Sequence, residues 1–370
     1  MKHLALSLAL AFVLVGCGDD QDSAEAPADI GAGKTIAQAQ CAGCHGLDGR
    51  GTAPGIPHMA AQVDTYLIES LQAYKEGKRV HAALRDMTAE LSIADTRNVA
   101  GFYASLPPLK DTAAMAPEKA VSPYDKGEAA AAACAGCHGE AGNSKTPGMP
   151  SLAGQQPGYF VTAVRAYLDG TRSISGKEML RELNNVDLES LALYYASQTP
   201  ARREAPSLGD PAAGEPLSAR CGGCHGAHGV SHDSATPSLA GQDAQYLVSA
   251  IKAYRDRSRR HDAMLADNTD KEIADIAAFY AVQESTAAES AQMSVQELAG
   301  KCDRCHGPDV ENPTMAIPKI EGQDRDYLIK ALRAYHDGKR GSSMMHRMSL
   351  PYSEAIIESV ASHYASQPAR

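Results

Sequence analysis

Tryptophan is absent from this 370-residue sequence, and aromatic side chains make up only 5% of it. Aromatic rings normally supply much of the buried volume of a small core, so cores of this composition are short of bulky filling. A bound apolar cofactor would supply the missing volume. The apolar content of 44% is otherwise ordinary and predicts a globular chain, and the length favours two to four domains.

A surplus of positive charge is also absent, because the formal net charge is −10. A nucleic-acid partner is therefore not expected. The acidic surplus is concentrated in residues 204–290, which carry 13 acidic and 7 basic side chains. An acidic surface there could face a basic partner, and the commoner alternative is a plain solvated surface.

The apolar run near the N-terminus is too short to be comfortable as a membrane span. Residues 4–15 follow Lys2 and have the length and flanks of a signal-peptide core. The run ends in Leu-Val-Gly-Cys, which resembles a bacterial lipobox and implies cleavage before Cys17 and lipidation of that residue; an ordinary signal peptide is the alternative. We therefore expect a signal peptide at residues 1–16, followed by lipidated Cys17 and a flexible acidic tether at residues 17–28. This anchor would hold the protein in the periplasm on a bacterial membrane.

Eight of the nine cysteines form a repeated motif. Each lies in a Cys-x-x-Cys-His-Gly segment, and the first cysteines of successive segments are 93, 87 and 81 residues apart. The motif residues are Cys41, Cys44 and His45; Cys134, Cys137 and His138; Cys221, Cys224 and His225; and Cys302, Cys305 and His306. A repeat on this scale predicts tandem structural units.

The repeat extends well beyond the cysteines. In every unit a proline is followed by a glutamine, a first tyrosine, a second tyrosine and an arginine at fixed spacing. These are Pro57, Gln62, Tyr66, Tyr74 and Arg79; Pro150, Gln155, Tyr159, Tyr167 and Arg172; Pro237, Gln242, Tyr246, Tyr254 and Arg259; and Pro318, Gln323, Tyr327, Tyr335 and Arg340. Each unit then closes with an apolar segment that contains Tyr103, Tyr195, Tyr280 or Tyr364.

The spacing of apolar residues predicts helices, and no stretch alternates convincingly enough to predict a strand. Apolar residues recur at three- and four-residue intervals in segments 66–74 and 99–103 and in their copies. The Ala-rich segment 126–134 before a cysteine pair is also expected to be helical. We predict an all-α fold of four small helical domains on short linkers, at residues 29–110, 118–203, 207–288 and 292–370.

The cysteine motif indicates covalently attached haem c. Positions i and i+3 share one face of a helix and i+4 lies beside them, so two thiols and an imidazole point to the same side. The thiols can bond to the haem vinyl groups while the imidazole binds the iron. A zinc site is an alternative, but the next cysteine pair is always more than 75 residues away. A redox dithiol or structural disulfide would not explain four histidines. We therefore predict four haem c groups.

A methionine is expected as the sixth iron ligand in each domain. Counting back sixteen residues from the closing tyrosine gives Met87, Met179, Met264 and Met348. The second unit contains no histidine besides His138, and the third contains no methionine besides Met264, which supports one register for all four. Met59 and Met149 lie before the middle helix and are expected to pack in the core or the pocket wall.

Other ligands stay open at some positions. In the fourth unit Met344 and Met345 lie close to Met348, and His81, His261 and His346 precede their methionines and could replace them or lie on the surface. A thioether opposite an imidazole favours Fe(II). With both axial positions filled by the protein no site is left for a substrate, which predicts an electron carrier and not an enzyme.

Each unit resembles a class I cytochrome c domain. The Pro…Leu-Ala-Gly-Gln stretches at 150–155 and 237–242 and the Tyr-Tyr-Ala-Ser ending at 194–197 are most similar to the two-haem cytochrome c4 group, here as four units. The resemblance implies a mainly helical fold, a distal methionine and periplasmic respiratory electron transfer. It also implies that each repeat proline accepts a hydrogen bond from the motif histidine; a helix-start proline is the alternative.

The remaining repeat residues have two interpretations each. The arginines could pair with haem propionates or lie at solvated helix ends, and the first tyrosine of each unit is more often core than chemistry. Repeat 1 departs from the pattern at Ala60-Ala61, where repeats 2 and 3 have Ala-Gly, and repeat 4 has Asp303-Arg304 inside its motif.

These expectations combine into one function. We expect a tetrahaem one-electron carrier in a respiratory chain, between a quinol-oxidising complex or dehydrogenase and a terminal oxidase, a reductase or another cytochrome. One alternative is a haem-bearing subunit docked permanently on a periplasmic oxidoreductase. The other is a haem enzyme, such as a peroxidase or a sulfur-compound dehydrogenase, which would need an open or differently ligated iron.

Overall fold

The computed structural model describes residues 27–112, 120–173, 177–204, 206–261, 265, 267–285, 293–308 and 315–370. Within these residues the regular structure is helical, with one isolated β-bridge between Arg79 and Arg340. This confirms the predicted all-α class. The expected signal peptide and Cys17 lie outside the described residues. None of the described helices is both long and apolar enough to cross a membrane.

Domains 1 to 3 each have a helix before the cysteine motif, a short helix that carries the motif, a middle helix and a closing helix, and in domain 4 one helix both precedes and carries the motif. The boundaries between the domains stay predictions. The elements of domain 1 are α1 (Ile30–Ile36), η1 (Ala37–Cys41), α2 (Ala42–His45), α3 (Asp64–Lys75), α4 (Ala82–Ala89) and α5 (Ile93–Ser105); those of domain 2 are α7 (Pro123–Ala131), α8 (Ala135–His138), η2 (Glu140–Gly142), α9 (Pro157–Leu168), η3 (Lys177–Glu182) and α10 (Asn185–Ser197). Domain 3 has α11 (Pro211–Ser218), α12 (Gly222–His225), α13 (Ala244–Arg255) and α14 (Asp270–Ala281), and domain 4 has α15 (Val295–His306), α16 (Arg325–His336), α17 (Ser343–Ser349) and α18 (Glu354–Ala365).

Side-chain caps fix where the closing helices begin. In α5, Ser92 accepts from the N–H of Asp95, and the Asp95 carboxylate accepts from the N–H of Ser92. Thr269 and Glu272 form the same reciprocal pair in α14, while α10 and α18 begin with single side-chain caps. Each cap satisfies N–H groups that the helix leaves unpaired and contributes about 1 kcal/mol.

The first and closing helices of domains 1 to 3 cross with their backbones in contact. A Cβ added at Gly33, Gly127 or Gly214 would lie 2.0, 2.1 or 2.0 Å from a carbonyl oxygen of the closing helix. Those oxygens belong to Asn98, Ser190 and Asp275. Because only glycine fits this distance, the crossing fixes the helix that leads into each cysteine motif.

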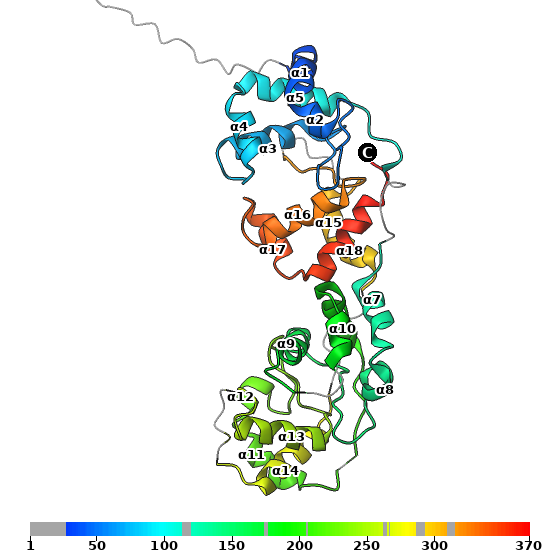
Figure 1. The fold of residues 1–370 in the computed structure, drawn as a ribbon, viewed down its shortest axis with the longest axis vertical. Helices are drawn as coiled ribbons and strands as arrows, with labels where there is room; N and C mark the ends of the chain where they lie inside the picture. Colours follow the sequence, from blue (N-terminus) through cyan, green and yellow to red (C-terminus); the bar gives the residue numbers. More distant parts are fainter. Residues whose placement is uncertain are drawn as a thin grey trace, which may run out of the picture.

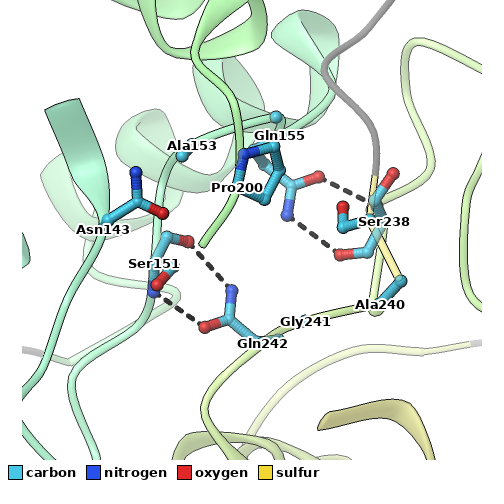
Figure 2. Close-up of a pocket in the computed structure, with 11 residues that line it drawn as sticks. Asn143, Ser151, Ala153, Gln155, Pro200, Ser238, Ala240, Gly241 and Gln242 are labelled. Atoms are coloured by element: carbon cyan, nitrogen blue, oxygen red, sulfur yellow. Dashed lines mark hydrogen bonds between the residues drawn. The ribbon is translucent and has the colours of Figure 1, made fainter. Parts of the chain in front are cut away.

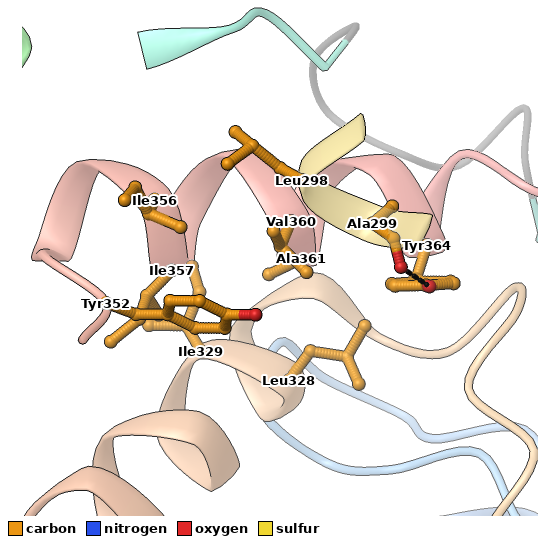
Figure 3. Close-up of a cluster of buried hydrophobic side chains, with 10 residues drawn as sticks. All are labelled: Leu298, Ala299, Leu328, Ile329, Tyr352, Ile356, Ile357, Val360, Ala361 and Tyr364. Carbon is orange, nitrogen blue, oxygen red and sulfur yellow. Dashed lines mark hydrogen bonds between the residues drawn. The ribbon is translucent and has the colours of Figure 1, made fainter. Parts of the chain in front are cut away.

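Each domain has its own hydrophobic core, centred on the tyrosine of the closing helix. Tyr103, Tyr195 and Tyr280 are each 1% exposed, and Tyr364 is 3% exposed. Figure 3 shows the core of domain 4, in which the hydroxyl of Tyr364 donates to the carbonyl of Ala299 at 3.0 Å. Burying one large apolar side chain contributes about 1.5–3 kcal/mol, and the paired hydroxyl avoids the cost of a buried unpaired donor.

The closing tyrosine also holds the loop that carries the repeat proline. Its carbonyl accepts from the residue four positions after that proline at 2.8–3.1 Å. These residues are Ala61, Gly154, Gly241 and Gly322, and they have φ values of 56–66°. Glycine adopts this left-handed conformation freely, whereas Ala61 does so at a cost of about 1–2 kcal/mol. The departure of repeat 1 at this position therefore has a structural cost.

The domains are not arranged in chain order. Along the long axis of the molecule they follow the order 1, 4, 2, 3 (Figure 1). The N–H of Gly55 in domain 1 donates to Asp324 in domain 4 at 2.7 Å, and Gly148 in domain 2 makes the equivalent bond to Asp243 in domain 3 at 2.8 Å. Domain 4 packs on domain 2 through α18 against α10 and α7. The first and last domains therefore form one pair, the 1/4 pair, and the middle domains form the 2/3 pair.

Candidate haem sites

The motif residues of each domain lie on or beside one short helical segment. Helices α2, α8 and α12 end at the motif histidine, and the glycine that follows has a φ of 64°, 78° or 80°. A side chain at this position would be strained, which explains why glycine follows histidine. In domain 4 Gly307 has a φ of −69°, so its turn differs. In each motif the second cysteine is exposed and the first is more buried.

Each motif histidine is held by a hydrogen bond to its repeat proline. The distance from Nδ1 to the proline carbonyl oxygen is 3.0, 2.9, 2.8 and 2.8 Å in domains 1 to 4. A carbonyl can only accept, so Nδ1 carries the proton and the Nε2 lone pair stays free to bind a metal. This confirms the hydrogen bond implied by the family resemblance. None of the four prolines begins a helix, so the helix-start alternative is wrong.

These side chains fit a covalently bound haem. Two thiols and one free Nε2 on one helical segment are the donor set that such a haem needs. Burial lowers the pKa of His45 and of His306, although the proline carbonyl opposes the shift, and this favours the neutral imidazole that binds metals. Across the part of the chain that the structure describes, no three His, Cys, Asp or Glu side chains gather into a metal-binding group. The cysteine pairs therefore do not converge as a zinc site would require.

The repeat arginines of the 1/4 pair are buried. Arg79 and Arg340 are 9% and 8% exposed, so the solvated-helix-end alternative is wrong for both. Each guanidinium lies over the second tyrosine of its own unit, 4.8 Å from the ring centre of Tyr74 and 4.4 Å from that of Tyr335. In domain 3 the Nη1 atom of Arg259 is buried without a hydrogen-bond partner. A haem propionate would satisfy this donor, and the propionate role of the arginines stays a prediction.

The first tyrosines of domains 1 and 4 meet across the domain interface. The hydroxyls of Tyr66 and Tyr327 are 3.1 Å apart, and Arg340 donates to Tyr66 at 2.8 Å. Burial alone would raise the pKa of Tyr66, but the cations of Arg340 and Arg79 lower it to about 8, while burial raises the pKa of Tyr327. Both tyrosines pack against their cores, as predicted. They also make a polar contact between domains, which the sequence does not predict.

The predicted methionine ligands differ in their exposure. Met87 in α4 and Met348 in α17 are half-buried, and Met179 in η3 is 52% exposed. Met264 lies outside the described residues. The axial role of all four stays a prediction. Met344, an alternative in domain 4, is 58% exposed.

The histidines that could replace these methionines have different surroundings. His81 caps α4, because its Nδ1 accepts a backbone N–H of that helix at 3.3 Å. His346 bonds through Nδ1 to a carbonyl in the last turn of α16 at 2.6 Å. The ring centre of His261 lies 6.1 Å from that of the motif residue His225. The bond of His81 favours a structural role, because its Nδ1 accepts and its Nε2 then carries the proton. The bond of His346 matches those of the motif histidines and leaves its Nε2 free, so His346 stays open as an alternative ligand.

The glutamine of the repeat has a role that its sequence position alone did not indicate. Its four copies are only 6–8% exposed, and each side chain bonds to the partner domain. We call them the interface glutamines: Gln62, Gln155, Gln242 and Gln323. Their recurrence at one position in all four units was the signal that could have found them.

The chain is similar to several known proteins. A family model described as cytochrome c matches residues 30–103. A cytochrome c4 from Pseudomonas aeruginosa is 30% identical over 203 residues, which is 52% of this chain and 98% of that protein. The chain belongs to the cytochrome c family. The resemblance to cytochrome c4 is thereby confirmed, and a cytochrome c domain implies covalently bound haem c.

Two further similarities were found. A protein named thiosulfate dehydrogenase electron acceptor, from Thiomonas intermedia, is 35% identical over 149 residues, which is 36% of this chain and 68% of that protein. Among solved structures, the reduced recombinant cytochrome c4 from Pseudomonas stutzeri is 28% identical, covers 44% of this chain and 98% of its own, and has a TM-score of 0.40. The relatives are thus electron-transfer cytochromes and an electron acceptor, and this chain is a related electron-transfer protein.

Proposed function

We propose that this chain is a tetrahaem c-type cytochrome that carries electrons one at a time. The observation that carries the proposal is one geometry repeated in four domains: two motif thiols and an imidazole whose Nδ1 lies 2.8–3.0 Å from a proline carbonyl. A haem bound at each motif supplies a reversible Fe(III)/Fe(II) couple. Two motif cysteines would attach each haem, eight in all. The proline bond holds each imidazole ring in a fixed orientation that presents Nε2.

The methionine register supports carriage over catalysis. The proposed sixth ligands are Met87, Met179, Met264 and Met348. With haem bound, these thioethers would supply the second protein ligand of each iron, which would leave no position for a substrate. Partner choice would then depend on the surfaces of the domains.

The spatial order of the domains supports electron transfer along the length of the molecule. Domains 1 and 3 lie at opposite ends, and domains 4 and 2 lie between them (Figure 1). A donor and an acceptor can therefore dock at opposite ends without competing. The acidic surplus of residues 204–290 suits a basic partner at the domain 3 end.

The proposed setting is the periplasm, with lipidated Cys17 as the membrane tether. The proposed donor is a quinol-oxidising complex or a dehydrogenase, and the proposed acceptor is a terminal oxidase, a reductase or another cytochrome. The export-type N-terminal sequence and the family support this setting. The relative named as an electron acceptor of thiosulfate dehydrogenase favours a second candidate, the electron-accepting partner of a periplasmic dehydrogenase.

The haem count and the iron ligands can both be tested on the exported protein. Mass spectrometry should find four covalent haems, and the double variant Cys221→Ala/Cys224→Ala should lose one. Fewer than four in the unaltered protein would refute the tetrahaem proposal. EPR of the oxidised protein should show only low-spin haem, and a high-spin haem would refute pure carriage. Purification as a monomer after removal of residues 17–28 would count against a permanently docked subunit.

A further inference from the structure

Each interface glutamine binds the backbone N–H and carbonyl of one particular residue of the partner domain. In the 1/4 pair, Nε2 of Gln62 donates to the carbonyl of Lys319 at 2.9 Å, and the N–H of Lys319 donates to Oε1 of Gln62 at 2.8 Å. In return, Nε2 of Gln323 donates to the carbonyl of His58 at 2.9 Å and its Oε1 accepts the N–H of His58 at 2.6 Å. Each contacted residue directly follows a repeat proline.

The 2/3 pair repeats this arrangement. Gln155 makes the same two bonds to Ser238 at 3.1 and 2.9 Å, and Gln242 makes them to Ser151 at 2.9 and 2.7 Å. Figure 2 shows the two glutamine side chains pointing in opposite directions, each toward the serine of the other domain. Two interfaces with different flanking residues thus share one reciprocal contact.

The orientation of each glutamine amide is fixed by its partners. Backbone N–H groups only donate and carbonyls only accept, so Oε1 must face the N–H and Nε2 must face the carbonyl. Oε1 also accepts the N–H of the residue after its own glutamine, at 2.8–3.0 Å in all four copies. The amide is therefore held at both ends inside a buried interface.

The peptide group that accepts from the motif histidine is the same one that donates to the glutamine. The carbonyl of Pro57 accepts the Nδ1–H of His45 at 3.0 Å, and the N–H of the same peptide group, on His58, donates to Oε1 of Gln323. Consecutive hydrogen bonds through one amide polarise each other. The bond to Gln323 thus makes the Pro57 carbonyl a stronger acceptor and the His45 imidazole a more electron-rich ligand.

We propose that the four interface glutamines are positioning residues that tune the haem of the opposite domain. Gln323 acts on His45, Gln62 on His306, Gln242 on His138 and Gln155 on His225, each through the proline peptide. An electron-rich imidazole favours Fe(III), so each glutamine lowers the reduction potential of the haem across the interface. Docking of the two domains of a pair therefore sets both potentials. The inference rests on the proposed function, since it requires haem iron on the motif histidines.

The test uses the full, haem-loaded protein and two readouts. In the reduced state, NMR follows the Nδ1–H proton of each axial histidine, which reports its hydrogen bond directly. A redox titration followed on assigned haem resonances gives the four midpoints. In Gln323→Met the Nδ1–H signal of His45 should move upfield and the domain 1 midpoint should rise, while His306 keeps its signal. Gln62→Met should move the Nδ1–H signal of His306 upfield and raise the domain 4 midpoint, while His45 keeps its signal.

A matched control separates tuning through the proline peptide from a general loosening of the interface. Asp324→Ala removes another bond across the same interface, the one to Gly55, and touches neither proline peptide. It should leave the Nδ1–H signal of His45 in place. If Gln323→Met and Asp324→Ala each move the Nδ1–H signals of both His45 and His306, the glutamine acts only by holding the domains together and the proposal is wrong.

The interface of the 2/3 pair provides an independent test in case a variant of the 1/4 pair fails to fold. Gln242→Met should move the signal of His138 and leave that of His225. Unchanged Nδ1–H signals in Gln323→Met and Gln242→Met would overturn the proposed tuning through the proline peptides, while the proposed cytochrome function would still stand. Absence of axial histidine signals in the unaltered protein would instead refute the haem ligation on which the proposal rests.

Discussion

Replacing glycine by alanine should destabilise the protein at Gly127, in the helix crossing of domain 2, and stabilise it at Gly300 in domain 4. In Gly127→Ala the new Cβ would lie 2.1 Å from the carbonyl oxygen of Ser190 and 2.7 Å from the Cβ of Tyr194. Helices α7 and α10 must separate by about 1.3 Å to reach an ordinary contact, and such overpacking costs about 2 kcal/mol. In Gly300→Ala, at an exposed position of helix α15, nothing lies within 4 Å of the new Cβ, so the variant should stabilise domain 4 by about 0.5–1 kcal/mol.

The assay for this prediction is amide hydrogen exchange resolved by peptide, because four domains need not unfold together. Exchange in α7 and α10 should become about 30-fold faster in Gly127→Ala, since about 1.4 kcal/mol corresponds to a factor of ten. Exchange in α15 should become about two- to fivefold slower in Gly300→Ala. Because α7 leads into the cysteine motif at residues 134–138, Gly127→Ala should also reduce haem loading of domain 2. Unchanged or slower exchange in α10 would mean that the helices cross less tightly than the backbone contact indicates.

Three further predictions concern single residues. Ala61→Gly should stabilise domain 1 by about 1 kcal/mol, measured by exchange of its amides, because glycine relieves the left-handed backbone. Burial alone would raise the pKa of Tyr66, but Arg340 and Arg79 lower it to about 8 from 10.0; stability from its ionisation is therefore complete above pH 10 and lost as the pH falls through 8. Denaturation of the 1/4 pair should show this rise between pH 8 and 10, and Tyr66→Phe should abolish it. Met179→Ala should leave one haem without its sixth ligand and produce one high-spin EPR signal, and an unchanged spectrum would show that the shared methionine register is wrong.

The helical class could be predicted because it depends on local sequence, whereas the histidine–proline bond was implied by the family resemblance. Apolar spacing within a segment sets a helix. Pro57 stands twelve positions after His45, a separation repeated in every unit, and the structure shows the ring and the carbonyl in contact. The environment of the arginines could not be predicted in this way. Arg79 and Arg340 are buried by each other's domains, and contacts between residues 248 and 274 positions apart leave no local pattern.

The conformation of repeat 1 shows a similar limit. The sequence places Ala60-Ala61 where repeats 2 and 3 have Ala-Gly, and the structure shows that Ala61 keeps the left-handed backbone of its glycine counterparts. Its N–H donates to the carbonyl of Tyr103 at 3.1 Å. Retaining this bond costs backbone strain, so the repeat fold overrides the residue's own preference. The sequence alone does not show whether the repeat fold or the backbone preference of alanine decides the conformation of residue 61.

The choice of domain partners cannot come from the repeat itself. Every unit carries the same proline, glutamine, tyrosine and arginine, so any two domains could form the glutamine contact. The contacts between domains 2 and 4 lie outside that set: Ser122 donates to the carbonyl of Met293 at 2.7 Å, and Ser359 donates to that of Val121 at 2.8 Å. These bonds join the outer faces of the two domains and leave the glutamine of domain 4 facing domain 1. Contacts outside the shared set of repeat residues therefore decide which domain each interface glutamine faces.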